Sequence, residues 1–449
     1  MSSSDSELNS DSSDDFSDEN RPFLAMLSSS SSEDEEESVF SSESDDNMVM
    51  SSDGDDVPED ARLERRVVRW QVHGSLLADV FDTSGDHNQH WSSLPVDIQD
   101  SKWMSEIRMT KGIFYELLQR VEDEMPVARI AEGPGSYAPH ERLFLTLSFL
   151  AHCPTLRYMG TKFGVPNNTM SVNILRPTMA VLKAELVTGP ESEIKWPHSI
   201  EEQNAAMSAF SFEHGLPGVI GAIDGSLLLM RKPSVKQAGP DTDSYLGYKG
   251  QIASLLLAVV SAGGLFTYVS AGLPGCFGDA GAFNTSELKR KIDAGLLSAT
   301  WLNTIGDDTR EYHPYLVGDG AFPLSICMQK CYTPAPPENS PKGRYNRAII
   351  NCRREVERVF GRLKGRWAFC NRNTFWGSPQ FTRDAHLVCC GLHNMLERRN
   401  VEYIPENIAN MDAQGLGQAL VHEHAGGNTA QGVALRERLT TFLSPPIQL

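Results

Sequence analysis

The sequence contains no uncharged apolar run of about 18 residues and no apolar stretch near its N-terminus. A membrane-spanning helix needs about 20 apolar residues, and a secretory signal needs an apolar segment behind a basic start. We therefore expect a soluble, intracellular protein that is neither secreted nor inserted into a membrane.

Paired cysteine motifs are also missing, because none of the eight cysteines forms a Cys-x-x-Cys unit. Cys327 and Cys331 flank a polar gap, and Cys389 and Cys390 are adjacent within an apolar helical pattern. Zinc sites and disulfide frameworks usually have characteristic spacings. Structural thiols in a reducing compartment are therefore expected in preference to a zinc site.

Basic residues are almost absent from residues 1–60, which hold 20 Asp and Glu and one basic residue, Arg21. The whole chain carries a formal net charge of −19, and subtraction from totals of 59 acidic and 40 basic residues leaves 39 of each beyond residue 60. We expect residues 1–62 to be a disordered, acidic, Ser-rich tail, because their apolar content is too low for folding. The tail is either a phosphorylation target or a solvated segment. The chain beyond residue 60 is neutral overall, so the net charge of the whole chain does not exclude a nucleic-acid partner.

Apolar residues at helical spacing indicate helices from about residue 101 to 187, and we assign a helical region to residues 100–188. Within it, one helix should end at Phe163, and a second should open at Pro166 after the turn Gly164-Val165. This is the outline of a helix-turn-helix, whose second helix would offer Asn167 and Asn168 to base edges. Many helical hairpins share the outline, so this pattern alone is a weak indication of DNA binding.

The periodicity changes after a linker at about residues 189–216. The segments GVIGAIDGSLLLM, IASLLLAVVSA and LFTYVSAG are typical of strands, with Gly263-Gly264 as a hairpin turn between the last two. A further strand in PYLVGDGAF should end at Asp319, and helices are expected after Asp279, at about 346–367 and at 384–399. Strands followed by helices predict a mixed α/β sheet.

Three carboxylates have unusual settings in this pattern. Asp224 stands in the middle of an apolar strand, Asp319 ends a later strand, and a glutamate lies on the long helix. An unpaired charge in an apolar interior is very costly, and such acids gathered at one sheet edge would suit two Mg²⁺ or Mn²⁺ ions. Each Asp alone could instead serve a turn or a cap. An aspartyl phosphotransferase is disfavoured because Ala222 stands where a second acid would be needed.

The long helix, NRAIINCRREVERVFGRLKGRW, is strongly basic. From Lys342 to Arg372 there are ten basic residues and two acids, Glu355 and Glu357, for a net charge of +8. This excess indicates either a surface for the phosphate backbone of nucleic acid or a solvated face. Glu355 and Glu357 fall on opposite margins of the apolar stripe, so periodicity alone leaves the choice between them open.

Five sequence blocks between about residues 110 and 397 resemble transposases of the PIF/Harbinger type and the nucleases domesticated from them. The blocks are GAIDGS with the following Pro233, Tyr248-Lys249-Gly250, LPGCFGDAGAFNTSEL, VGDGAFPL and YNRAIINCRREVERVFGRLKGRW. Two details depart from the usual family pattern: Ser226-Leu227 replaces Thr-His, and Cys276 replaces Ser. These departures concern the substrate groove and leave the carboxylates unchanged.

The resemblance implies an RNase H-like core, here residues 217–398, with a DDE triad that hydrolyses DNA with Mg²⁺ or Mn²⁺ and, in a transposase, transfers strands. Carried onto this sequence, the triad is Asp224, Asp319 and Glu357, the glutamate being the one followed by Arg-x-Phe-Gly. Asp279 aligns with a further acid and is expected to be a fourth metal ligand or a helix N-cap. The residues expected to hold the DNA backbone are Lys249, Arg353, Arg354 and Lys364.

The resemblance also implies a Myb-like DNA-binding partner that supplies specificity and nuclear import. A tight Lys/Arg run is missing from the sequence, which fits borrowed import, so we expect a nuclear protein shared with the cytoplasm. A homo-oligomer is compatible with the sequence, and residues 399–449 are expected to be a C-terminal tail. Two competing interpretations stay open: a non-catalytic DNA-binding protein that retains the fold, and an interaction scaffold that uses the acidic tail.

Overall fold

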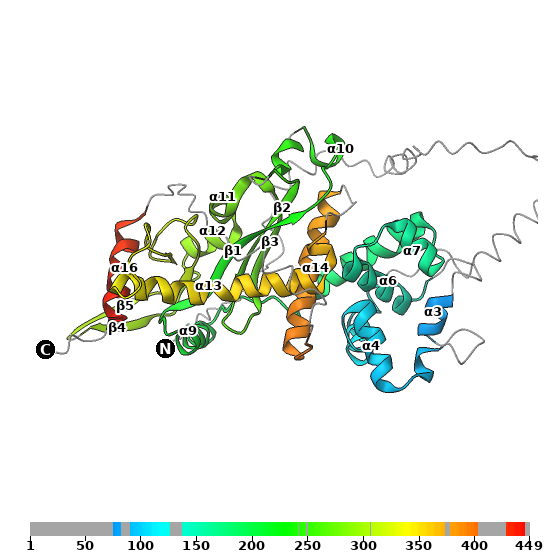
Figure 1. Ribbon diagram of the computed structural model, residues 1–449, viewed down its shortest axis with the longest axis horizontal. Coiled ribbons are helices and arrows are strands. Elements are labelled where there is room, and N and C mark those ends of the chain that lie inside the picture. Colours follow the sequence, from blue (N-terminus) through cyan, green and yellow to red (C-terminus); the bar gives the residue numbers. More distant parts are fainter. Residues whose placement is uncertain are drawn as a thin grey trace, which may run out of the picture.

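The computed structural model describes residues 75–81, 90–125, 137–240, 242–247, 250–305, 307–372, 378–402 and 428–444. The predicted acidic tail at 1–62 and the predicted backbone contact Lys249 lie outside these residues. The described part consists of a helical region, a mixed sheet covered by helices, and a small hairpin at the far end (Figure 1).

The helices expected between about residues 101 and 187 are present. They pack through an aromatic cluster in which Trp103, Phe114 and Phe144 are fully buried. The helix predicted to end at Phe163 ends there, with Gly164 in the left-handed conformation at φ 71°, and the next helical segment begins directly after Pro166. The helices of this region are α3 (Ser75–Val80), α4 (Val96–Ile107), α5 (Lys111–Val121), α6 (Pro139–His152), α7 (Leu156–Phe163), a π-helical segment (Thr169–Leu175), α8 (Arg176–Lys183) and a second π-helical segment (Ala184–Thr188).

The predicted linker at 189–216 is wrong in its second half, because this part is the helix α9 (Ile200–His214). Ser199 caps the helix by accepting a hydrogen bond from the Glu202 backbone N–H, while the Glu202 carboxylate accepts from the Ser199 N–H. Its inward face includes Gln203, which donates to the Leu296 carbonyl and accepts from the Ala299 N–H. A polar inward residue weakens the apolar periodicity on which the prediction depended.

The predicted strands form one five-stranded mixed sheet in the order β3-β2-β1-β6-β7. The strands β1, β2 and β3 pair antiparallel, and the turn between β2 and β3 contains Gly263-Gly264 as predicted. The strand β6 pairs parallel with β1 on its other side, and β7 pairs parallel with β6. The strands are β1 (Val219–Leu229), β2 (Ala253–Val260), β3 (Phe266–Pro274), β6 (Tyr315–Val317) and β7 (Met328–Gln329).

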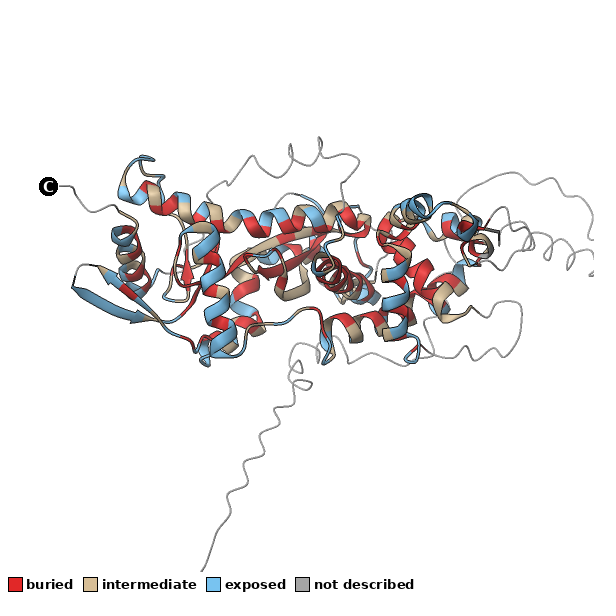
Figure 2. Ribbon diagram, turned by 90° about the horizontal axis from the view of Figure 1, so that it is seen from below, coloured by how far each residue is buried: buried red, intermediate tan, exposed pale blue. Residues whose placement is uncertain are grey.

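Helices cover both faces of this sheet (Figure 1). The long helices α13 (Pro341–Arg366) and α14 (Pro379–Arg398) lie against one face and begin about five residues earlier than predicted. On the other face lie α11 (Gly278–Thr285) and α12 (Glu287–Asp293), where one continuous helix was expected; Ser286 separates them and caps the second. In Figure 2 the inner strands of the five-stranded sheet and the helix faces that turn toward them are largely red, which marks the core, whereas the edge strand β3 is mostly of intermediate burial.

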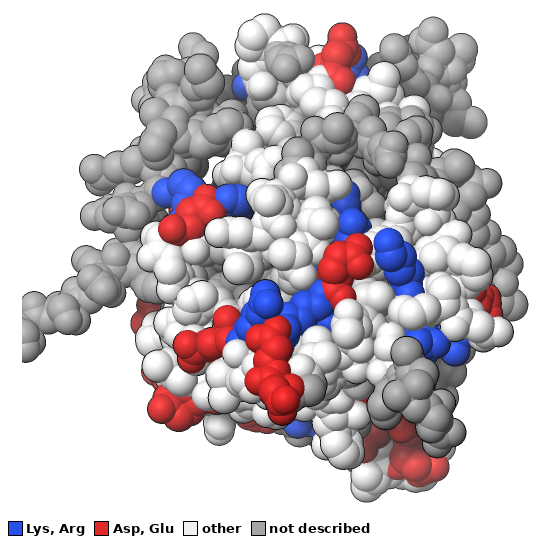
Figure 3. Space-filling view, turned by 90° about the vertical axis from the view of Figure 1, so that its left-hand side faces the viewer, with Lys and Arg blue, Asp and Glu red and all other residues white. Residues whose placement is uncertain are grey.

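The end of the molecule farthest from the helical region was not anticipated from the sequence. Strands β4 (Trp301–Ile305) and β5 (Asp308–Tyr312) form a separate, exposed hairpin. Residues 399–449, expected as a tail, include α16 (Ala430–Phe442), which packs against α13 and β4. Charges of both signs are interspersed at this end (Figure 3), and Arg438 of α16 forms an ion pair with Asp308 of the hairpin. Among the described helices, none combines the length and the apolar composition needed to cross a membrane.

Candidate metal centre

Asp224 and Asp319 are brought together by the pairing of two parallel strands. Ala222 of β1 pairs with Val317 of β6. Asp224 follows Ala222 by two residues, and Asp319 follows Val317 by two residues. Asp224 is still within β1, whereas Asp319 lies two residues past the end of β6, so the parallel pairing brings the two acids to the same end of neighbouring strands. The Oδ1 atom of Asp224 accepts from the Gly225 N–H at 2.9 Å, and that of Asp319 accepts from the Ala321 N–H at 2.9 Å. Local backbone groups therefore orient both acids.

Asp279 reaches the same place from the opposite layer. It lies in the first turn of α11, where the N-cap residue is Phe277, so the predicted alternative of an N-cap role is not what the structure shows. Its carboxylate lies directly over Gly225, where any side chain would overlap it. One carboxylate oxygen each of Asp224, Asp279 and Asp319 lies within 4.8 Å of the others. Three segments of the chain thus deliver three acids to one point.

Glu357 lies next to this trio through a shared arginine. Arg353, one helical turn earlier on α13, places its guanidinium 3.2 Å from Oε1 of Glu357 and 3.7 Å from Oδ2 of Asp224. The Glu357 side chain is 41% exposed, whereas that of Asp224 is 16% exposed. Glu357 therefore forms the solvent-facing margin of the group, and we name Asp224, Asp279, Asp319 and Glu357 the acidic centre.

The other candidate glutamate occupies a different environment. Glu355 is buried on the opposite margin of α13, where it forms an ion pair with Arg358 and lies 3.3 Å from Nε2 of His214 on α9. It is turned toward the α9–α13 contact and away from Asp224. The tertiary structure thereby separates two residues that the helical pattern left equivalent: of the two, Glu357 is the one that shares an arginine with Asp224.

The electrostatics of the acidic centre are strained by an excess of negative charge. Burial raises the pKa of the Asp224 carboxyl to about 8, and the neighbouring carboxylates of Asp279 and Asp319 add to the rise, while the Arg353 guanidinium opposes it. A carboxyl group held protonated near neutral pH marks a place where a cation is strongly favoured. The donor set fits Mg²⁺ or Mn²⁺, because both are hard ions that prefer carboxylate oxygens.

The residues predicted to hold the DNA backbone differ in their exposure and in their contacts. Arg354 is exposed and contacts Asn351 at 3.3 Å, whereas Arg353 is directed into the acidic centre with 14% of its side chain exposed. Lys364 donates to the Leu227 carbonyl of β1 at 3.3 Å. Asn167 and Asn168 are exposed at the start of their helix, in the helical region beyond α14 (Figure 1), and are not part of the acidic centre.

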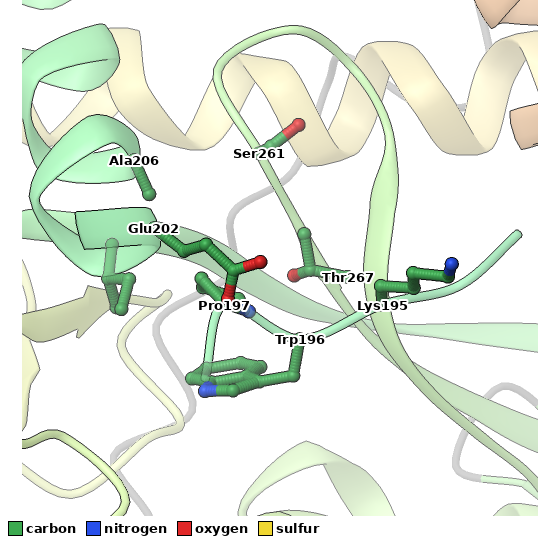
Figure 4. A pocket seen from close by; sticks show the side chains of 8 residues that line it. Lys195, Trp196, Pro197, Glu202, Ala206, Ser261 and Thr267 are labelled. Carbon is green, nitrogen blue, oxygen red and sulfur yellow. The ribbon is translucent and has the colours of Figure 1, made fainter. Parts of the chain in front are cut away.

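Two features of the acidic centre went unnoticed in the sequence. The first is the contact of Arg353 with the acids, for which its i,i+4 spacing from Glu357 was an available signal. The second is the need for glycine at position 225, which follows from the approach of Asp279 and has no signal beyond the Asp-Gly pair itself. A small open pocket of about 190 Å³ on the sheet, lined by Trp196, Pro197 and Thr267 among others (Figure 4), includes none of the four acids of the acidic centre.

Sequence comparison relates the part of the chain that carries the acidic centre to a known family. Residues 223–394 match the model of the DDE superfamily endonuclease family. The matched range begins one residue before Asp224 and includes all four acids of the acidic centre. The predicted resemblance to Harbinger-type transposase-derived nucleases is thereby confirmed.

Individual relatives agree with this class at low identity. The protein named "Protein ALP1-like" of Arabidopsis thaliana is 26% identical over 259 residues, which cover 57% of this chain and 60% of that protein. The protein named "Putative nuclease HARBI1" of Rattus norvegicus is 24% identical over 301 residues, which cover 67% of this chain and 78% of that protein. The match therefore spans about three fifths of the first relative and more of the second. No solved structure matches the chain significantly.

Proposed function

We propose that this protein is a divalent-metal-dependent DNA endonuclease of the PIF/Harbinger type, with an RNase H-like catalytic core at residues 217–398. The observation that carries the proposal is the convergence of Asp224, Asp279 and Asp319 from three segments, with Glu357 beside them on α13. The family match over residues 223–394 supports the same reading.

The acidic centre suits metal ions for reasons that lie in its own chemistry. It offers only carboxylate oxygens, it is half-buried, and the Arg353 guanidinium contacts two of its four acids, Asp224 and Glu357. When bound, Mg²⁺ or Mn²⁺ supplies the positive charge that stabilises the attacking and leaving oxygens of a phosphodiester. Asp224 and Asp319 would hold the ions between them, Asp279 would add a ligand, and Glu357 would complete the outer side.

The remaining roles belong to positioning. Arg354 and Lys364 would contact the phosphate backbone, which fixes the register of the duplex without reading its sequence. In a transposase the freed 3′ hydroxyl would then attack target DNA. We further propose that the region at 100–188 binds DNA through Asn167 and Asn168. A Myb-like partner would add specificity and import, which makes the nucleus, shared with the cytoplasm, the expected place of action.

The test is cleavage of plasmid DNA by the full chain in Mn²⁺, compared with Asp319→Asn. The variant should lose at least about 1,000-fold in cleavage rate while DNA binding stays equal or becomes stronger, because a negative charge near phosphate is removed. Asp293→Asn, an exposed position on α12, is the matched control and should cleave normally.

Each outcome assigns the protein to one of the open interpretations. Normal cleavage by Asp319→Asn removes Asp319 from the mechanism. DNA binding without cleavage by the unmodified chain, in any divalent metal, identifies the protein as a DNA-binding protein that retains the fold without the activity.

A further inference from the structure

We propose that Arg353 is an internal counter-ion of the acidic centre, which holds the acids together before metal binds and must be displaced when metal enters. This inference rests on the proposed function, since it concerns the same centre. It also reassigns Arg353, which the basic pattern of its helix had marked as a contact to the DNA backbone.

The geometry places the guanidinium between a strand and a helix. Its Nη2 atom lies 3.7 Å from Oδ2 of Asp224 on β1 and 3.2 Å from Oε1 of Glu357 on α13. One cation therefore bridges two carboxylates that belong to different elements and to opposite sides of the centre. A metal ion bound to the same two carboxylates would bridge them in the same way.

The two cations compete because they share ligands. A divalent ion at the Asp224, Asp279 and Asp319 oxygens would lie a few ångströms from the guanidinium, and two positive charges at that separation repel strongly in a half-buried site. The present position also leaves the buried Nε of Arg353 without a hydrogen-bond partner. A buried N–H group without a hydrogen-bond partner costs free energy compared with one that is hydrogen-bonded to water. Displacement of the Arg353 side chain toward solvent would remove this cost.

Two effects of opposite sign follow. Without metal, Arg353 offsets part of the repulsion among the four acids and so stabilises the fold. With metal, the same charge opposes binding and lowers the affinity. A residue with a merely structural role would produce the first effect without the second, so the pair of effects distinguishes the two roles.

The experiment is a Mn²⁺ titration of the full chain by calorimetry, with thermal unfolding in EDTA as the second readout. Arg353→Gln should bind Mn²⁺ at least about tenfold more tightly than the unmodified chain, because one neighbouring positive charge is gone. Its unfolding temperature in EDTA should be lower. Arg353→Lys, which keeps the charge, should bind Mn²⁺ within about threefold of the unmodified chain.

The matched control is Arg354→Gln, which removes the same charge from the adjacent, exposed position. Its Mn²⁺ affinity should stay within about threefold of the unmodified chain, because exposed charges are well screened. Unchanged or weaker Mn²⁺ binding by Arg353→Gln, with binding by the unmodified chain intact, overturns the counter-ion role and leaves the proposed function standing. Mn²⁺ binding by neither protein overturns the proposed function itself.

Discussion

The molecule contains two dense groups of charged residues, and they differ in how their charges are balanced. In the acidic centre, the Arg353 guanidinium contacts two of the four carboxylates, those of Asp224 and Glu357. Between the helical region and α14, by contrast, arginines and glutamates alternate. Arg120 of α5 contacts Glu185 at 2.7 Å and Glu193 at 2.8 Å, and Glu193 also pairs with Arg398 of α14.

This difference is consistent with the proposed function of the acidic centre and with a structural role for the second group. The junction group, Arg120, Glu185, Glu193 and Arg398, satisfies its charges internally and links segments far apart in the sequence. In the acidic centre, burial and the neighbouring carboxylates of Asp279 and Asp319 outweigh the Arg353 guanidinium and raise the pKa of Asp224. An imbalance of this kind in a half-buried site is typical of a place where an external cation binds.

The largest expected effect comes from replacing one of the two glutamates of α13, Glu357 and Glu355. Glu357→Gln should reduce the rate of DNA cleavage about 1,000-fold or more, because it removes a carboxylate from the acidic centre. Glu355→Gln should leave cleavage per folded molecule unchanged and should lower the free energy of unfolding by about 1–3 kcal/mol, because it weakens a buried contact with Arg358 and His214. Cleavage rates together with urea unfolding measure both. Equal loss of cleavage in the two variants would contradict the distinction.

A smaller effect is expected at Gly225, which contributes space and no charge. Gly225→Ala should displace the Asp279 carboxylate and weaken Mn²⁺ binding about 10- to 100-fold, since orientation of a ligand affects affinity on this scale. Gly320→Ala, adjacent to Asp319, is the control, because a Cβ there meets nothing within 4 Å. Calorimetric titration of both variants is the measurement. Unimpaired binding by Gly225→Ala would mean that Asp279 is not a ligand.

The smallest effect concerns stability without metal. The pKa of Asp224 is about 8 in the folded protein and about 3.9 in an unfolded chain, so between these values only the folded state retains the proton. Stability should therefore fall as pH rises from about 4 to 8. Asp224→Asn should unfold a few degrees higher than the unmodified chain at pH 8 in EDTA, with the gap closing near pH 4. An Asp224→Asn variant that is less stable than the unmodified chain at pH 8 in EDTA would contradict the raised pKa of Asp224.

The sequence was sufficient for elements with a strong pattern. The apolar runs of β1, β2 and β3 predicted strands, and the stripe from Val356 to Trp367 predicted the buried face of α13. Elements with a weak apolar pattern were not predicted. The helix α9 turns Gln203 inward, and the hairpin β4–β5 is exposed on most of its residues, so neither has the apolar periodicity that marks an element.

The acidic centre was predictable in part. Its strand acids were visible because a carboxylate in an apolar run is unusual, and the family resemblance selected Glu357 over Glu355. The pairing of Ala222 with Val317, which sets Asp224 beside Asp319, depends on a long-range strand register that local pattern does not encode. The position of Arg353 between two acids likewise depends on how α13 crosses β1.

The central claim is that the acidic centre is a cation site and the junction group is not. The most direct test is a Mn²⁺ titration of the full chain by calorimetry, compared with Asp224→Asn and, as the matched carboxylate of the junction group, Glu193→Gln. We predict that Asp224→Asn loses the tightest binding step and that Glu193→Gln keeps it. Retention of that step in Asp224→Asn, or its loss in Glu193→Gln alone, would contradict the account.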